Sequence, residues 1–223
     1  MSQVVSSLDN DIQDKSLLKH RFYQMWSAGS LSIENLGGYS KEYFQLVRAV
    51  PILVNNVLRQ VTPEFERSYA LSATMRHNLE EEKEHITPWI SFADSIGVTE
   101  NELNEYECSE KTQKAVAEML QLTTESVAAG ISTLYTYEKQ LPEISTKKIE
   151  GLVKFYGVRN DMALNYFRIH EKVDIEHAKL WGSLIDLMPA SQHPTIRDAA
   201  SASLKCQNMI LDGVCDKYLS NTS

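Results

Sequence analysis

The stretch YFRIHEKVDIEHAKLWGSLIDLM, residues 166–188, predicts how the chain folds. Its large apolar residues, from Phe167 onward, recur every three or four positions. That spacing places side chains on one face of an α-helix. The middle of this stripe holds His170, Asp174 and His177, which are polar residues on a face that should turn toward a core. The stretch therefore predicts a long buried helix with a polar site in it.

Residues 71–96 repeat this combination of an apolar stripe with polar interruptions. Large apolar residues again follow one another by three or four, and Glu82 and His85 lie in the middle of the stripe. Glu81 lies one position away, about 100° around a helix, so it should turn elsewhere and can be solvated. Taken alone, His85 also fits a hydrogen-bonded histidine of an ordinary core.

A third segment ends near Pro142 and has the same character. Val127, Ile131 and Leu134 share a helical face, and Glu138 occupies the next position on it. Taken alone, Glu138 could be a helix-end residue beside the proline. Its place on an apolar stripe predicts that this carboxylate points inward.

Three carboxylates and three imidazoles on inward faces predict a site for two metal ions. An ionised carboxylate buried without a partner costs several kcal/mol, and no Lys or Arg lies on these stripes. Two divalent cations would balance the charge, and paired carboxylates and imidazoles in a helical core form such centres. Oxygen and nitrogen ligands suit iron or manganese, as Fe/Fe or Fe/Mn, while zinc is an alternative. No cysteine is among the candidates, which argues against an iron–sulfur cluster.

Length and charge define the broad class of protein. We expect one domain, residues 1–223, because a chain of 223 residues can bury a sizeable core. The net charge is −8 without a cluster of Lys or Arg, so neither nucleic acid nor a membrane is expected as a partner. The polar start MSQVVSSLDNDIQDK does not resemble a signal peptide, and three cysteines form no metal-binding spacing. A cytoplasmic location fits these features.

The periodicity predicts an all-α protein of about seven to eight helices. Pro142 and Pro88 should end or bend helices near the site. The two glycines of ENLGGYS should make a helix irregular, and TENE from Thr99 predicts a short capped turn of helix. The predicted long helices span about 8–27, 32–60, 63–97, 110–141, 143–157, 160–188 and 192–219.

Three stretches of the sequence resemble a known family. FYQMWSAGSLSIENLGGYSKEYF, STLYTYEKQLPEISTKKIEGLVKFYG and YFRIHEKVDIEHAKLW are similar to the chlamydial death-domain-associating proteins and their bacterial relatives. These are heme-oxygenase-like diiron oxidases, in a superfamily that includes thiaminase II and pyrroloquinoline-quinone synthase. The resemblance runs from about residue 15 to the C-terminal helix and implies a heme-oxygenase-like helical bundle.

The resemblance also implies a set of iron ligands. Those matching the family position for position are Glu138, His170, Asp174 and His177. Glu82 and His85 match the family's first-helix pair, although family members have about one more helical turn between these two residues. The loss of one turn keeps both residues on the same face of the helix, but it makes Glu81 a rival for Glu82 as the ligand.

The activity that the resemblance implies is the oxygen-dependent formation of para-aminobenzoate for folate. A tyrosine of the protein itself is implied as the source of the ring, and here it matches Tyr23 in FYQMW. Tyr39 matches a second family tyrosine near the site, and the implied amino donor matches Lys148, with Lys147 as its rival. A reduced diiron pair can bind and activate dioxygen when coordination positions stay open.

Three other functions remain open at this point. An oxidase of the same fold could use the same ligands on an external small molecule. A thiaminase-like hydrolase would need a nucleophilic cysteine, for which Cys108 is the candidate. A non-enzymatic protein could bind a host death-domain protein, although the sequence reveals no docking surface for one. A homodimer also remains open.

Overall fold

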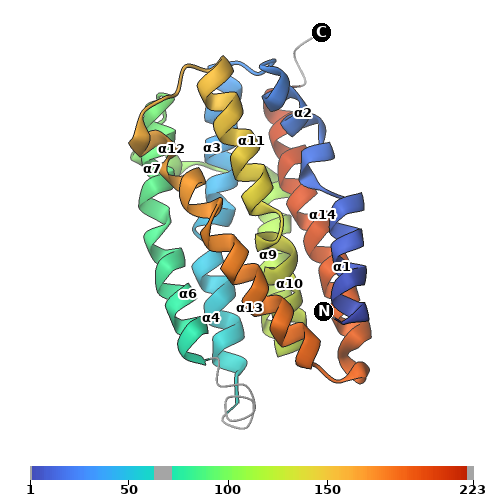
Figure 1. Cartoon of the computed structure of the whole chain (residues 1–223). Helices are drawn as coiled ribbons and strands as arrows, with labels where there is room; N and C mark the ends of the chain where they lie inside the picture. Colours follow the sequence, from blue (N-terminus) through green and yellow to red (C-terminus); the bar gives the residue numbers. More distant parts are fainter. Residues whose placement is uncertain (1, 63–71, 220–223) are drawn as a thin grey trace.

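Nearly all of the chain that the structure describes is α-helical, which confirms the predicted all-α class. The structure is a computed structural model and describes residues 2–62 and 72–219. Its longer helices run side by side in an elongated bundle (Figure 1). The α-helices are α1 (Gln3–Asp14), α2 (Arg21–Ala28), α3 (Ile33–Val47), α4 (Val50–Gln60), α6 (Ser72–Glu84), α7 (Ile86–Ser95), α8 (Glu100–Glu105), α9 (Glu110–Glu125), α10 (Val127–Glu138), α11 (Leu141–Phe155), α12 (Asp161–His170), α13 (Val173–Leu187) and α14 (His193–Tyr218).

Five of the predicted long helices are interrupted, so their prediction as continuous helices is wrong. The apolar stripe continues through each interruption, and periodicity alone cannot distinguish two successive segments from one helix. Residues 63–71 of the predicted third helix lie outside the described residues. The predicted helix 8–27 comprises α1, a short 3-10 helix (Leu17–Lys19) and α2. The predicted helix 32–60 comprises α3 and α4, and the predicted helix 63–97 includes α6 and α7. The predicted helix 110–141 comprises α9 and α10, and the predicted helix 160–188 comprises α12 and α13.

Local chemistry explains several of these helix starts. Pro51 lies in the first turn of α4, where its missing N–H removes no helical hydrogen bond. Ser126 begins α10 by accepting a hydrogen bond from the backbone N–H of Ala129. Pro88 and Pro142 lie in the first turns of α7 and α11, as predicted for prolines that separate helices near the site. Each site helix is therefore a separate short segment with its own direction.

Two smaller sequence features have different outcomes. Thr99 accepts a hydrogen bond from the backbone of Glu102 at the start of α8, which confirms the predicted capping box. The glycines of ENLGGYS do not make α3 irregular, because α3 is a regular helix from Ile33 to Val47. A Cβ atom at Gly38 would lie 2.5 Å from the ring of Tyr218 on α14. That glycine is required for the close packing of α3 on α14.

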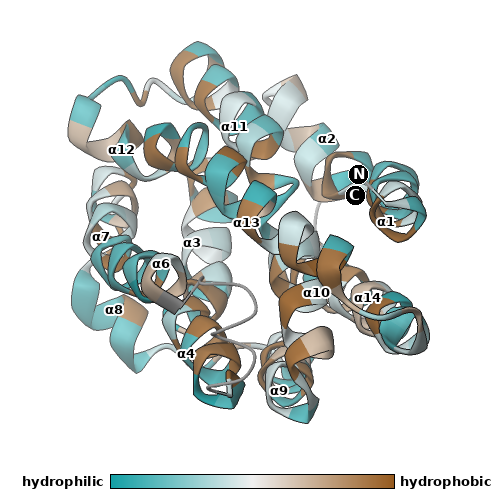
Figure 2. Cartoon of the chain, turned by 60° about the horizontal axis from the view of Figure 1, so that its bottom comes forward, coloured by the Kyte–Doolittle hydropathy of each residue, from teal (hydrophilic) through white to brown (hydrophobic). Residues whose placement is uncertain are grey.

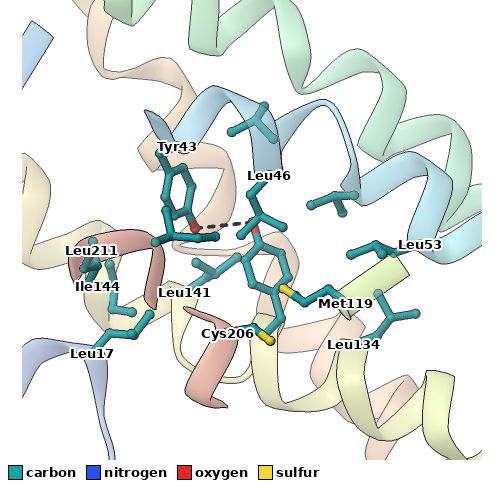
Figure 3. Close-up of a cluster of buried hydrophobic side chains, with 14 of the residues drawn as sticks. Leu17, Tyr43, Leu46, Leu53, Met119, Leu134, Leu141, Ile144, Cys206 and Leu211 are labelled. Carbon is teal, nitrogen blue, oxygen red and sulfur yellow. Dashed lines mark hydrogen bonds between the residues drawn. The ribbon is translucent and has the colours of Figure 1, made fainter. Parts of the chain in front are cut away.

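α10 is the central helix of the bundle, and its position buries one end of the site. Every residue from 128 to 138 is buried, and α10 packs against α4, α9, α13 and α14. The hydrophobic faces of the surrounding helices turn inward (Figure 2). One cluster of buried side chains in the core includes Tyr43 from α3, Leu134 from α10 and Cys206 from α14 (Figure 3). None of the helices in the described part of the chain is long and apolar enough to cross a membrane.

Candidate metal centre

Six acidic and imidazole side chains converge on one buried region between α6, α10, α12 and α13. None of them is more than 6% exposed. The end of α6 and the residue after it provide two, the last residue of α10 provides one, and the α12–α13 junction provides three. In that order, they are Glu82 and His85, then Glu138, then His170, Asp174 and His177.

The three residues of the α12–α13 junction do not share one continuous helix, so that part of the sequence prediction is wrong. α12 ends at His170, and α13 begins at Val173 after a turn. Asp174 and His177 therefore project from the first turns of a new segment. The three-or-four spacing continues across the turn, which is why the sequence resembled one helix.

Glu82, His85 and His170 form the first possible metal-binding group. Each offers one ligand atom, and these atoms all lie within 4.8 Å of one another. Nδ1 of His85 lies 3.4 Å from Oε2 of Glu82, and the His85 and His170 ring centroids are 4.7 Å apart. One ion could therefore contact two imidazoles and a carboxylate here.

His177 lies at the centre of a second group, which also contains Glu82 and Glu138. Its Nδ1 atom is 3.5 Å from Oε1 of Glu82, 3.7 Å from Oε2 of Glu138 and 3.6 Å from Oδ1 of Asp174. These separations exceed the usual N–H···O range of about 2.7–3.2 Å. They suit ligands that each lie about 2.0–2.2 Å from one ion. Glu82 belongs to both groups, as expected of a carboxylate shared by two ions.

The buried polar atoms of this region fit a bound metal. Buried side-chain nitrogen and oxygen atoms are nearly always hydrogen-bonded in folded proteins. Several atoms here have no hydrogen-bond partner within residues 2–62 and 72–219, and a donor set of oxygen and neutral imidazole nitrogen suits iron or manganese. The atoms are Nδ1 of His85, Oε1 of Glu138, both carboxylate oxygens of Asp174 and Nδ1 of His177.

Hydrogen bonds from behind the site orient several of these side chains. Nδ1 of His170 is 2.7 Å from the backbone oxygen of Tyr166, which leaves Nε2 free to face the site when Nδ1 carries the proton. The indole N–H of Trp181 donates a 2.6 Å hydrogen bond to Oε2 of Glu138. Sequence reasoning missed this role, although Trp181 occupies the next position on the stripe after His177.

Glu81 and Glu82 lie in different surroundings. The Glu82 side chain is 5% exposed and belongs to both candidate groups. The Glu81 side chain is 30% exposed, and its Oε2 lies 3.2 Å from Nε2 of His177, on the other side of the ring from Nδ1. The structure therefore places Glu82 inside the cluster and Glu81 at its rim.

Without a cation, the charges of the cluster are in conflict. Burial raises the pKa of Glu138 well above its usual range and also raises that of Asp174. Burial opposes the charged form of Glu82 too, but the contacts with His177 and His85 outweigh it and hold the pKa of Glu82 at about 2. Burial lowers the pKa of His177, but Asp174 and Glu82 outweigh it and raise that pKa to about 11. A divalent cation would favour the charged form of all the carboxylates at once.

Tyr23, Tyr39 and Lys148, the other predicted site residues, form a second buried group. Nζ of Lys148 donates a 2.6 Å hydrogen bond to the Tyr39 hydroxyl, which lies 3.2 Å from the Tyr23 hydroxyl. The Lys148 side chain is only 2% exposed, and Nζ lies 5.3 Å from the Tyr23 ring centroid. Burial lowers the pKa of Lys148 to about 7. Lys147 is partly exposed and pairs with Glu150 instead, so the structure brings Lys148 and not Lys147 to the tyrosines.

The two groups are joined by a series of aromatic contacts. The Tyr166 ring stacks on the His170 ring with centroids 4.1 Å apart. The Trp89 ring lies 4.7 Å from the Tyr166 ring and 5.8 Å from the Tyr39 ring, centroid to centroid. Packed rings therefore lead from the metal-binding cluster to the Tyr23 group. This arrangement was not predictable from the sequence, because aromatic residues such as Trp89 and Tyr166 are ordinary in a helical core.

Cys108 lies apart from both groups. It is in the segment between α8 and α9, and it lines a surface groove with Arg48 and Tyr106. Burial raises the pKa of its thiol, so the reactive thiolate is disfavoured. The position gives no support to a thiaminase-like nucleophile.

The chain matches a known family and a named relative. Residues 51–209 match the family model described as an iron-containing redox enzyme. The chain is 32% identical over 217 residues to the 4-aminobenzoate synthase of Chlamydia trachomatis, which covers 95% of this chain and 92% of that protein. The resemblance to the chlamydial family, stated from the sequence motifs, is confirmed.

Solved structures with little sequence identity share the fold. A TenA homologue from Pseudomonas syringae superposes with a TM-score of 0.82 at 15% identity, over 96% of this chain and 93% of the other. A domain with a heme oxygenase-like fold from Shewanella denitrificans superposes with a TM-score of 0.77 at 14% identity, over 97% of this chain and 90% of the other. The predicted heme-oxygenase-like bundle is confirmed.

Proposed function

The chain belongs to the family of iron-containing redox enzymes, and from that premise we propose that it forms 4-aminobenzoate with dioxygen at a centre of two metal ions. The ring comes from Tyr23 and the nitrogen from Lys148. The observation that carries this proposal is the buried contact between these two residues, with Nζ of Lys148 5.3 Å from the Tyr23 ring centroid. The metal cluster alone would suit many oxidases.

The chemistry of the product explains why such a pair is needed. Conversion of a tyrosine side chain into 4-aminobenzoate breaks the Cα–Cβ bond and oxidises the β-carbon to a carboxyl group, with dioxygen as the oxidant. It also replaces the ring hydroxyl by the lysine nitrogen, whose bond to Cε must break. The nitrogen donor must present a lone pair, and an ordinary lysine is protonated near pH 7. Burial lowers the pKa of Lys148 to about 7, so a large fraction of chains holds the neutral amine.

The cluster would hold the ions with oxygen and nitrogen ligands only. Glu82 is shared between the two groups, His85 and His170 complete one, and Glu138 and His177 complete the other. When bound, two redox-active ions supply the binding and reduction of dioxygen. The chain's own residues exclude bulk water and fix the ligands, with Trp181 holding Glu138 in place.

The aromatic residues between the two groups would carry oxidation to Tyr23. Tyr23 has no hydrogen bond to any of the six cluster residues among its recorded contacts, and its hydroxyl faces Tyr39. Tyr166, stacked on His170, and Trp89, packed against both Tyr166 and Tyr39, bridge the gap. An electron leaving Tyr23 can pass along these rings while its proton moves to the Tyr39 hydroxyl, which passes its own proton to the neutral amine of Lys148.

The decisive experiment follows the origin of the ring. Protein made with isotope-labelled tyrosine, loaded with iron or with iron and manganese, is reduced and exposed to oxygen. We expect labelled 4-aminobenzoate, at most about one molecule per chain, because a ring taken from the chain cannot be replaced. Tyr23→Phe should abolish the product and keep the bound metal. Tyr218→Phe is the control, because the Tyr218 hydroxyl bonds with that of Tyr106 rather than with Tyr23, Tyr39 or Lys148.

An oxidase acting on an external small molecule is the second candidate. A cavity of about 450 Å³ opens between α1, α10 and α13 and reaches the buried Asp174, so a small substrate has room beside the cluster. Unlabelled product, or many turnovers from an added compound, would favour this function over the use of Tyr23. Either result leaves the proposed metal centre in place.

A further inference from the structure

A second, smaller cavity reaches His177 of the cluster. Its volume is about 240 Å³, and its walls come from α6 and α13. Its mouth includes the exposed Thr74 and His77, and its inner wall includes the buried Asn78 and His177. The cavity therefore connects the surface to a residue of the candidate metal centre.

The side-chain amide of Asn78, in the wall of this cavity, is buried without a hydrogen-bond partner among the described residues. Its side chain is 1% exposed, yet neither its amide nitrogen nor its amide oxygen has a hydrogen-bond partner in the described parts of the chain. It lies one helical turn before Glu82, so it shares the inward face of α6 with that residue. Buried amides are rarely left unpaired, and such a group beside a cavity indicates a missing polar or polarisable ligand.

The walls of the cavity select the kind of ligand. Val173 and Leu180 make part of the lining apolar. An anion would meet the carboxylates of Glu81 and Glu176, which also line it. These carboxylates already contact His177 and Lys179, so they offer little to a cation. A small neutral molecule fits these conditions best.

We propose that this cavity binds dioxygen and that the Asn78 amide N–H is the hydrogen-bond donor that holds it beside His177. The proposal rests on the oxygen-dependent function stated above and adds a location and a binding residue to it. The wider cavity at Asp174 has a volume of about 450 Å³ and therefore has room for a larger molecule. Dioxygen would then enter through the cavity at Asn78, and a larger molecule would enter through the cavity at Asp174.

Nitric oxide, a neutral diatomic that binds ferrous iron, tests the donor role without product formation. Ferrous protein is titrated anaerobically with nitric oxide and followed by absorption. Asn78→Leu, of similar volume, should weaken nitric oxide binding by about tenfold, since one hydrogen bond is lost, and should slow single-turnover product formation more at low dioxygen than at saturating dioxygen. Its iron content should match that of the wild type. Asn208→Leu is the matched control, because that amide donates to the Leu204 carbonyl within its own helix, α14.

A pair of mouth variants tests the route. Thr74→Phe narrows the Asn78 cavity, and Ser183→Phe narrows the Asp174 cavity from an equally exposed helical position. Only Thr74→Phe should slow the association of nitric oxide. This pair also keeps the proposal testable if Asn78→Leu fails to fold.

Each contrary result has a distinct meaning. Unchanged affinity in Asn78→Leu, or equal association rates in the two mouth variants, would overturn the gas site. Loss of iron from Asn78→Leu would overturn it as well, since the amide would then hold the ion. Azide binding that depends on Asn78 more strongly than nitric oxide binding does would overturn the neutral ligand. Failure of the iron-loaded wild type to bind nitric oxide at all would instead contradict the proposed function.

Discussion

At the scale of single residues, Glu81 and Glu82 are adjacent in sequence but differ in their contacts. Glu82 belongs to both candidate metal groups, whereas the Glu81 carboxylate contacts Nε2 of His177 and lies 3.6 Å from Nε2 of His77. We expect Glu82→Ala to lose most of the bound metal, because both ions lose a ligand. Glu81→Ala should retain it. The metal content per chain of the two variants is measured by mass spectrometry after desalting. If Glu81→Ala loses metal and Glu82→Ala retains it, the wrong face of α6 has been assigned to the site.

Lys148 should make stability depend on pH. Its pKa falls from an ordinary value of 10.5 to about 7 in the fold, so between these values the unfolded chain binds the extra proton. Stability therefore rises as pH increases from about 7 to 10.5 through this group. The cost of holding Lys148 at pH 7 is at most about 5 kcal/mol. Lys148→Met should raise the melting temperature at pH 7, and the gain should shrink toward pH 10.

The neighbouring lysine supplies the control for this measurement. Lys147 is partly exposed and pairs with Glu150, so Lys147→Met should change the melting temperature little at any pH. Both variants are compared with the metal-loaded wild type by calorimetry in the same buffers. A constant difference in melting temperature between Lys148→Met and the wild type from pH 7 to 10 would mean that Lys148 is protonated in the folded state.

The residues of the site were largely predictable, whereas their supporting contacts were not. Glu138 and His170 were predictable because charged or polar groups on an apolar stripe are rarely buried without a partner. Trp181 and Trp89 are apolar residues on apolar stripes, so the sequence gives no signal that one bonds a ligand and the other bridges two groups. Burial of Lys148 was also not predictable, because a lysine on a helix is ordinarily solvated.

At the scale of elements, the contact between α2 and α11 positions the Tyr23 group. The indole of Trp26 on α2 donates a 3.2 Å hydrogen bond to the backbone oxygen of Lys148 on α11. A Cβ atom at Gly151 would lie 2.6 Å from the Trp26 ring. Gly151→Ala should therefore push the two helices apart, destabilise the protein by about 1–3 kcal/mol and reduce product more than metal content.

Denaturant unfolding and metal analysis of the same samples test this prediction. Gly37→Ala is the control on another helix, because its Cβ would meet only one methyl group of Val98, at 3.2 Å. If Gly151→Ala makes product at the wild-type rate, the spacing of α2 and α11 does not govern the reaction.

Helix positions were easier to predict than helix interruptions. α11 and α14 lie within two residues of their predicted bounds because a proline or a polar turn flanks each of them. The turn between α12 and α13 contains neither Gly nor Pro, and Glu171 and Lys172 are residues that favour helices. That turn is imposed by packing at the site, which a local pattern does not record.

At the scale of the whole molecule, the metal ions should stabilise the fold. Their removal leaves three carboxylates buried together, Glu82, Glu138 and Asp174. A loss of about 3 kcal/mol would lower the melting temperature by about 6–12 °C for a protein of this size. Calorimetry before and after chelation measures this fall in melting temperature, and re-addition of iron or manganese should restore the original melting temperature. An equal melting temperature in both states would indicate solvated carboxylates.

The burial of Tyr23 has a consequence for the life of each molecule. Its side chain is 2% exposed and packs against the rings of Phe22 and Trp26. Loss of such a ring from a core costs about 3–5 kcal/mol, a large part of the roughly 5–15 kcal/mol that holds a domain together. A chain that has reacted once should therefore be digested by a protease faster than one kept without oxygen. Protein that has reacted would then be degraded faster than unreacted protein, and the rate of product formation would follow the rate at which new protein is synthesised.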